Sequence, residues 1–122
     1  MPAVFTDVGE NLATDYFDGT ANAPANWFVH WGTGTTAPVV TNTVLETPAS
    51  EARVTATEAQ PASNQNRLTA TLTANGAKTI SEVGVFDAAS AGNMPVRGTF
   101  TGIVLATNDK IDFTITITWT GS

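Results

Sequence analysis

The sequence predicts an all-β fold, an antiparallel β-sandwich or jelly-roll-like domain with one short helix near its N-terminal end. Segment 110–119, KIDFTITITW, alternates apolar and polar residues without interruption, and segment 67–74, RLTATLTA, repeats the pattern. Such alternation is typical of a strand with one buried and one solvated face. Threonine supplies 22 of the 122 residues, and β-branched side chains favour strands. Six or seven short strands, separated by Gly, Pro and Asn with no helix between them, favour a sandwich over a βαβ architecture.

The one segment with a helical pattern is 5–18, FTDVGENLATDYFD. Its apolar residues recur every three or four positions, which is the spacing of one face of an α-helix. Thr6 is the expected N-cap, and Gly19 is the expected C-cap glycine. The apolar face of this helix should consist of Phe5, Val8, Leu12 and Tyr16.

Two of the expected strands are joined by a hairpin signal. Asn75-Gly76 lies between strand 67–74 and segment 78–88, KTISEVGVFDA. Both residues tolerate positive φ, which two-residue hairpin turns require. We therefore expect these two strands to pair with each other. Further strands are expected at 27–32, 52–58 and 94–105.

Two stretches should depart from regular strand geometry. In 94–105 the apolar residues change sides across Gly102, which predicts a β-bulge or a bend. Segment 47–66, TPASEARVTATEAQPASNQN, contains two proline-containing stretches and few large apolar side chains. We expect it to form an edge strand flanked by mobile loops.

Length favours a single domain that covers 1–122, because a chain of 122 residues can bury one core and is short for two. The small residues and the proline of 20–26 indicate a connection. Within the domain, residues 1–20 should hold the helix and residues 26–120 the sandwich.

Composition excludes several classes of function. The chain has no cysteine, which removes disulfides, thiolate zinc sites and cysteine nucleophiles. Its formal charge of −6 opposes direct binding of nucleic acid. No apolar run is long enough to cross a bilayer, and the first ten residues lack the pattern of a secretory signal. We therefore expect no cofactor, no metal ion, no nucleic acid and no membrane among the partners.

Segment 26–38, NWFVHWGTGTTAP, looks at first like a phosphate-binding loop. It lacks the lysine of a P-loop, and a proline follows it instead of a helix. Gly32 and Gly34 are therefore expected to form a tight turn at the end of a strand, in conformations closed to other residues. His30 is the only histidine, and in a strand it is expected to pack or to form an interface rather than to catalyse.

Glu82 interrupts an otherwise apolar strand, and Arg97 lies early in the next one. If the two strands pair in antiparallel fashion, these side chains can form a charge-assisted contact. Burial of either charge alone would be costly. The sequence therefore predicts a structural ion pair between Glu82 and Arg97.

The three tryptophans admit two interpretations. Trp27 and Trp31 share the strand parity of Val29, so we expect these residues, together with Trp119, to pack in the core or at a subunit interface. The alternative is that the three tryptophans form an aromatic platform for sugars.

Five segments cover nearly the whole chain: FTDVGENLATDYFDGT, NWFVHWGTGTTAP, LETPASEARVTAT, KTISEVGVFDAASAGNMPVRGTF and NDKIDFTITITW. Together they resemble small virion proteins encoded by tailed bacteriophages, which are often labelled structural, tail-fibre or decoration proteins. The resemblance brings no catalytic residue with it. It implies a β-rich building block that is present in many copies.

Two hypotheses for the function follow. The first is a capsid cement or decoration protein on the outer surface of the capsid, assembled in the host cytoplasm. It would form dimers or trimers and bind across major capsid protein subunits by packing and strand addition. The alternative is a tail component, such as a fibre, tip or adaptor module, that could bind host-surface glycans. A carboxylate glycosidase is disfavoured, because so short a β-domain has little room for a long substrate groove.

Overall fold

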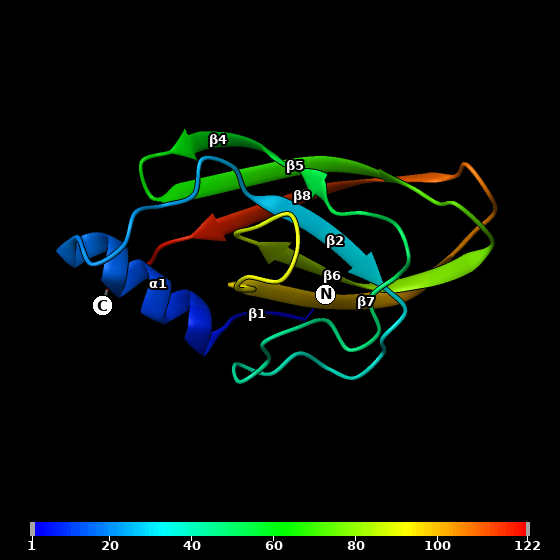
Figure 1. Ribbon diagram of the computed structural model, residues 1–122, viewed down its shortest axis with the longest axis horizontal. Coiled ribbons are helices and arrows are strands. Elements are labelled where there is room, and N and C mark those ends of the chain that lie inside the picture. Colours follow the sequence, from blue (N-terminus) through cyan, green and yellow to red (C-terminus); the bar gives the residue numbers. More distant parts are fainter. Residues whose placement is uncertain (1, 122) are drawn as a thin grey trace.

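The computed structural model describes residues 2–121, which form eight strands and one helix (Figure 1). In chain order the elements are β1 (Ala3–Phe5), α1 (Asp7–Asp18), β2 (Phe28–Gly32), β3 (Val54–Thr55), β4 (Thr57–Ala62), β5 (Gln65–Thr73), β6 (Lys78–Phe86), β7 (Val96–Leu105) and β8 (Lys110–Thr118). One sheet has the order β1-β7-β6-β2-β3 and the other the order β4-β5-β8. All neighbouring strands are antiparallel, so the predicted mainly-β class is confirmed.

Strand β8 confirms the alternation read from segment 110–119. It pairs with β5 from Gln65↔Thr118 to Thr73↔Lys110 without a break. The threonines between its apolar residues are exposed, while the apolar side chains are half-buried against the core. The half-buried residues are Ile111, Phe113, Ile115 and Ile117. Trp119 follows directly after the strand.

The bulge predicted within 94–105 is present in β7. Ile80 pairs with Ile103 and Glu82 pairs with Thr99, so the one residue between them in β6 lies opposite three residues of β7. Gly102 belongs to this longer stretch. The extra residues explain why the apolar positions of β7 change sides there.

The predicted hairpin across Asn75-Gly76 is wrong, because β5 and β6 lie in different sheets. Neither Asn75 nor Gly76 adopts positive φ, so the two-residue turn does not form. The Asn75 N–H instead donates to the Glu51 carboxylate at 2.8 Å, and the Ala74 N–H donates to the Asp109 carbonyl at 2.8 Å. The bond from Ala74 continues the β5–β8 pairing, and the bond from Asn75 ties the chain to Glu51 before it enters β6 in the other sheet.

Segment 52–58 is two strands rather than one. Strand β3 ends at Thr55, and the Ala56 N–H donates to the Trp27 carbonyl at 2.8 Å. Strand β4 then begins at Thr57 in the other sheet. Each strand lies at an edge, in agreement with the edge-strand prediction for 47–66, because the chain crosses between sheets at this corner.

The main core lies between the two sheets. Val29 and Trp31 of β2 are 0% exposed, and Leu72 of β5 is 1% exposed. The Trp31 ring meets Phe113 of β8 edge-on, with 6.4 Å between ring centroids. A second, smaller cluster consists of Leu45, Phe86 and Met94. Since Phe86 follows the core residue Val85 in β6, this cluster lies on the opposite face of the sheet.

Helix α1 has both of the caps that its sequence predicts. The Thr6 hydroxyl accepts a hydrogen bond from the Gly9 N–H at 3.0 Å, and Gly19 ends the helix with a φ of 81°. The predicted start at Phe5 is too early, because Phe5 lies in β1 and pairs with Val96. Phe5 lies three residues before Val8, which fits the spacing of a helix face. A residue at the end of a short strand directly before the N-cap has the same spacing.

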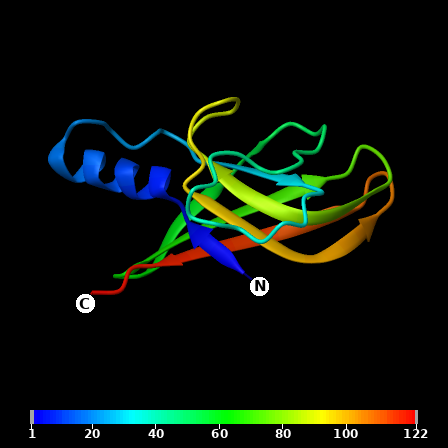
Figure 2. The same cartoon turned by 90° about the horizontal axis from the view of Figure 1, so that it is seen from below.

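Helix α1 extends beyond the end of the sandwich instead of crossing a sheet (Figure 2). Gly9 is the only helix residue that is buried, whereas Leu12 and Tyr16 are half-buried. Phe17 is 97% exposed. Within residues 2–121, no helix has the length and apolar character to span a bilayer.

Candidate functional site

The Gly-Thr-Gly-Thr-Thr run holds anionic groups, but they are carboxylates of the same chain. The Gly34 N–H donates to Glu82 Oε2 at 2.9 Å. The N–H groups of Thr35 and Thr36 donate to Glu46 Oε1 at 2.8 and 3.1 Å. The Thr36 hydroxyl donates to the other oxygen of Glu46. The hydrogen bonds from the Thr36 side chain and backbone lower the pKa of Glu46 below its usual value.

Gly32 and Gly34 differ from the tight turn that the sequence predicts. Neither has positive φ, and the chain runs on from β2 without a turn at either residue. A Cβ atom on Gly32 would lie 2.4 Å from the Thr47 carbonyl oxygen, and one on Gly34 would lie 2.5 Å from Glu82 Oε2. Glycine is needed here for close packing rather than for an unusual backbone conformation.

The structure brings Glu82 and Arg97 together. Arg97 Nε and Nη2 each lie 3.1 Å from Glu82 Oε1, and the side chains of Arg97 and Glu82 are 1% and 0% exposed. Arg97 also donates to Asn42 Oδ1 and to the Thr36 carbonyl, both at 3.1 Å. Glu82 accepts further hydrogen bonds from the backbone N–H groups of Gly34, Glu46 and Thr47. This network fastens the β2–β3 loop, residues 33–53, to the five-stranded sheet.

Glu51 is another carboxylate that ties this loop to the sheets. It accepts hydrogen bonds from Trp31 Nε1 at 3.0 Å, from the Asn75 N–H at 2.8 Å and from the Lys78 ammonium group. Burial raises the pKa of Glu51, but the hydrogen bonds from Lys78, Asn75 and Trp31 outweigh it and lower the pKa to about 2. Glu51 therefore remains ionised and paired at neutral pH.

His30 packs between the loop and the sheet. Its Nε2 atom lies 2.8 Å from the Glu51 carbonyl oxygen and 3.2 Å from that of Ala49. Its ring meets Phe86 edge-on, with 6.4 Å between centroids. Within residues 2–121, no group of three or more His, Asp or Glu side chains is placed to hold a metal ion.

The four residues expected in the core or at an interface separate into two pairs. Val29 and Trp31 are fully buried in the core. Trp27 is half-buried and Trp119 is 45% exposed, and both line a cavity beside helix α1. A sugar platform of three tryptophans is not formed, because the small sheet covers Trp31.

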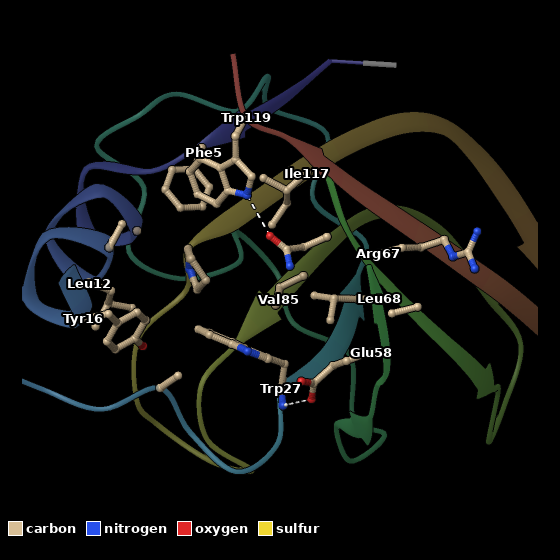
Figure 3. A pocket seen from close by; sticks show the side chains of 16 residues that line it. Phe5, Leu12, Tyr16, Trp27, Glu58, Arg67, Leu68, Val85, Ile117 and Trp119 are labelled. Atoms are coloured by element: carbon tan, nitrogen blue, oxygen red, sulfur yellow. Dashed lines mark hydrogen bonds between the residues drawn. The ribbon is translucent and has the colours of Figure 1, made fainter. Parts of the chain in front are cut away.

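This cavity lies between helix α1 and the end of the sandwich, and its volume is about 250 Å³ (Figure 3). Leu12 and Tyr16 reach into it from the helix, opposite Leu68 and Val85 of the two sheets. Burial raises the pKa of Tyr16, and the negative charges of nearby aspartates raise it further. The phenol of Tyr16 therefore stays protonated at neutral pH and can donate a hydrogen bond.

Aromatic and polar groups meet at the ends of the cavity. The Phe5 and Trp119 rings are edge-on, with 5.4 Å between centroids. Asn66 Oδ1 accepts from Trp119 Nε1 at 2.7 Å. Glu58 Oε2 accepts a long hydrogen bond of 3.4 Å from the backbone N–H of Trp27. The cavity thus combines aromatic rings with an amide and a carboxylate.

The sequence pattern does not predict this cavity, although it indicates Trp27 and Trp119 as packing or interface residues. The available signal was the pair Leu12 and Tyr16, which share one face of the only expected helix. No second helix was expected to cover that face. The partners Asn66 and Glu58 lie in strands whose local pattern shows nothing unusual.

The fold and the site define a structural β-sandwich module, in which buried charges fasten loops and a surface cavity presents aromatic rings. Residues 4–118 match the family model described as podophage GP4 fiber I protein gp80. The chain belongs to this family of phage tail-fibre proteins, which are structural proteins and not enzymes. No curated protein and no solved structure matches the chain.

The family match corrects the first hypothesis for the function. The resemblance to phage virion proteins is confirmed, but the family is one of fibre proteins rather than of capsid cement proteins. The chain is therefore a virion component of the fibre, and the tail alternative is better supported than the outer surface of the capsid.

Proposed function

We propose that this protein is a fibre building block that associates with further copies of itself along strand β8. The observation that carries the proposal is the open edge of that strand, which within residues 2–121 pairs with β5 alone. An unpaired strand edge is a template for strand addition. Neither the fold nor the family supports contact with the major capsid protein, so we propose copies of this chain as the partner.

The open edge presents the backbone groups of alternate β8 residues. The Trp119 N–H donates to the Asn64 carbonyl at 2.8 Å, and the Ala74 N–H donates to the Asp109 carbonyl at 2.8 Å. Together with the register of β5 and β8, these bonds show that the backbone N–H and C=O groups of the odd-numbered β8 residues point toward β5. The groups that point outward belong to the even-numbered residues Lys110, Asp112, Thr114, Thr116 and Thr118.

The edge has little of the protection that soluble proteins give to such strands. Charged residues, prolines and covering elements are the usual protection. In β8 the charges of Lys110 and Asp112 lie at one end, and segment 113–118, FTITIT, has neither a charge nor a proline. A further strand at this edge would also cover the half-buried apolar side chains of β8.

The substitution Thr114→Pro tests the proposal on the whole protein. Proline removes an outward N–H and leaves the bonds between β8 and β5 in place. We expect the wild type to associate and Thr114→Pro to raise the dissociation constant at least about ten-fold, since one strand-addition bond and its neighbours are lost. Sedimentation velocity over a concentration series measures both this constant and the number of copies.

The matched control is Thr114→Val, which keeps the N–H group and suits a strand. It should associate like the wild type, and circular dichroism should show that both variants are folded. A wild-type protein that stays monomeric at all concentrations contradicts the proposal. Equal association of Thr114→Pro and Thr114→Val contradicts it as well.

A further inference from the structure

The cavity beside helix α1 is bounded by aromatic rings on several sides. Trp27 lies at one end, and Trp119 with Phe5 lies at the other (Figure 3). Tyr16 forms part of the helix side. Trp and Tyr suit positions where one side of the ring is apolar and the other meets polar groups. The C–H faces of a sugar ring are a matching apolar surface.

Free hydrogen-bonding groups lie among these rings. Asn66 uses Oδ1 for Trp119, which leaves its NH₂ group without a partner in the part of the chain that the structure describes. The Tyr16 hydroxyl likewise has no partner there, and Glu58 accepts only the long bond from Trp27. An amide donor, a phenol and a carboxylate acceptor together match the hydroxyl groups of a sugar.

The size and the charge of the cavity restrict the ligand. Its volume of about 250 Å³ lies below the roughly 300–1,000 Å³ that is common for drug-sized ligands, so one ring fits better than several. Arg67 and Glu58 are both among the lining residues, but the Arg67 side chain extends away from the cavity (Figure 3). An anionic sugar would therefore meet an uncompensated carboxylate. We propose that this cavity binds one neutral hexopyranose unit of a glycan.

An apolar side chain from another copy of the protein is the competing occupant. It would cover the walls formed by Leu12 and Leu68. It would also bury the Asn66 amide and the Tyr16 hydroxyl without giving them a partner, which is unfavourable. The C–H faces of a sugar ring would cover the apolar walls, and its hydroxyl groups would pair with the polar groups. The geometry therefore favours the sugar.

An NMR titration of the whole protein with methyl glycosides of glucose, galactose, mannose and N-acetylglucosamine tests this proposal. The three tryptophans supply three indole N–H signals. We expect the signals of Trp27 and Trp119 to shift with at least one glycoside at millimolar concentration. The Trp31 signal should stay in place, because that ring is 0% exposed and its indole donates to Glu51.

Two substitutions locate the site and a third serves as the control. Trp119→Ala removes an exposed ring and should abolish the shift of the Trp27 signal, and Tyr16→Phe removes one hydroxyl and should weaken binding about five-fold. Phe17→Ala is the matched control, because Phe17 is 97% exposed and is not part of the cavity wall. The edge variant Thr114→Pro should bind sugar like the wild type, so this proposal and the strand-addition proposal fail independently.

Three results would overturn the sugar site. One is the absence of a shift at Trp27 and Trp119 with every glycoside while the spectrum is that of a folded protein. Another is equal affinity of the wild type and Trp119→Ala. The last is a change of both indole signals with the concentration of the Thr114→Pro variant alone, which would show that a second copy fills the cavity without strand addition at β8.

Discussion

The β2–β3 loop and helix α1 are both attached to the five-stranded sheet, but by opposite means. The loop is held by the buried charges of Glu82 and Arg97, each with several hydrogen-bond partners. The helix is held by its N-cap and by the close approach of Gly9 to Pro95, where an added Cβ would lie 2.9 Å away. In this fold, buried paired charges hold the loop, whereas the polar groups beside the helix keep free hydrogen-bonding capacity within residues 2–121.

The largest effect should come from Arg97→Ala, which removes the partner of a buried carboxylate. We expect a loss of about 3 to 5 kcal/mol in the free energy of unfolding, because Glu82 is left charged and buried. Urea denaturation measures this loss. The helix-side control Phe17→Ser should stay within about 0.5 kcal/mol of the wild type, since Phe17 is almost fully exposed. Similar losses for both variants would break the contrast between the two regions.

A smaller effect is expected where the loop packs on the Glu82 carboxylate. In Gly34→Ala the new Cβ would lie 2.5 Å from Glu82 Oε2 and 2.6 Å from Glu46 Cβ. The crowding should lower the free energy of unfolding by about 1 to 3 kcal/mol. Gly76→Ala is the control, because its Cβ would meet nothing within 4 Å. If the thermal midpoints of the two variants agree, close packing at Gly34 is not what requires glycine.

The smallest effect should be the acid sensitivity of Glu51. Its pKa is lowered from 4.5 to about 2 in the folded protein, so it contributes stability above pH 4.5. That contribution should fade as the pH falls from about 4.5 to about 2. Urea midpoints measured across this range should fall less steeply for Glu51→Gln than for the wild type.

The matched control for the acid series is Glu58→Gln at the cavity. Within residues 2–121 its carboxylate accepts one hydrogen bond of 3.4 Å, so this variant loses far less hydrogen bonding than Glu51→Gln. If Glu51→Gln and Glu58→Gln give the same profile of urea midpoint against pH, the hydrogen bonds at Glu51 are not what holds the loop at neutral pH.

The sequence by itself determined the elements whose signals are local. The alternation in 110–119 predicts β8, and Thr6 and Gly19 predict the ends of the helix. A strand face and a helix cap depend on residues only a few positions apart. The charge of Glu82 within an apolar strand was also informative, because a buried carboxylate needs a partner.

Tertiary structure alone decided which strands pair and how the cavity is built. Asn75-Gly76 favours a hairpin locally, yet the bond from the Asn75 N–H to Glu51 helps to carry the chain into the other sheet. The cavity joins Phe5 and Tyr16 to Trp119, which come from opposite ends of the chain. No local pattern encodes such a meeting, because it depends on the packing of both sheets and on where the helix leaves them.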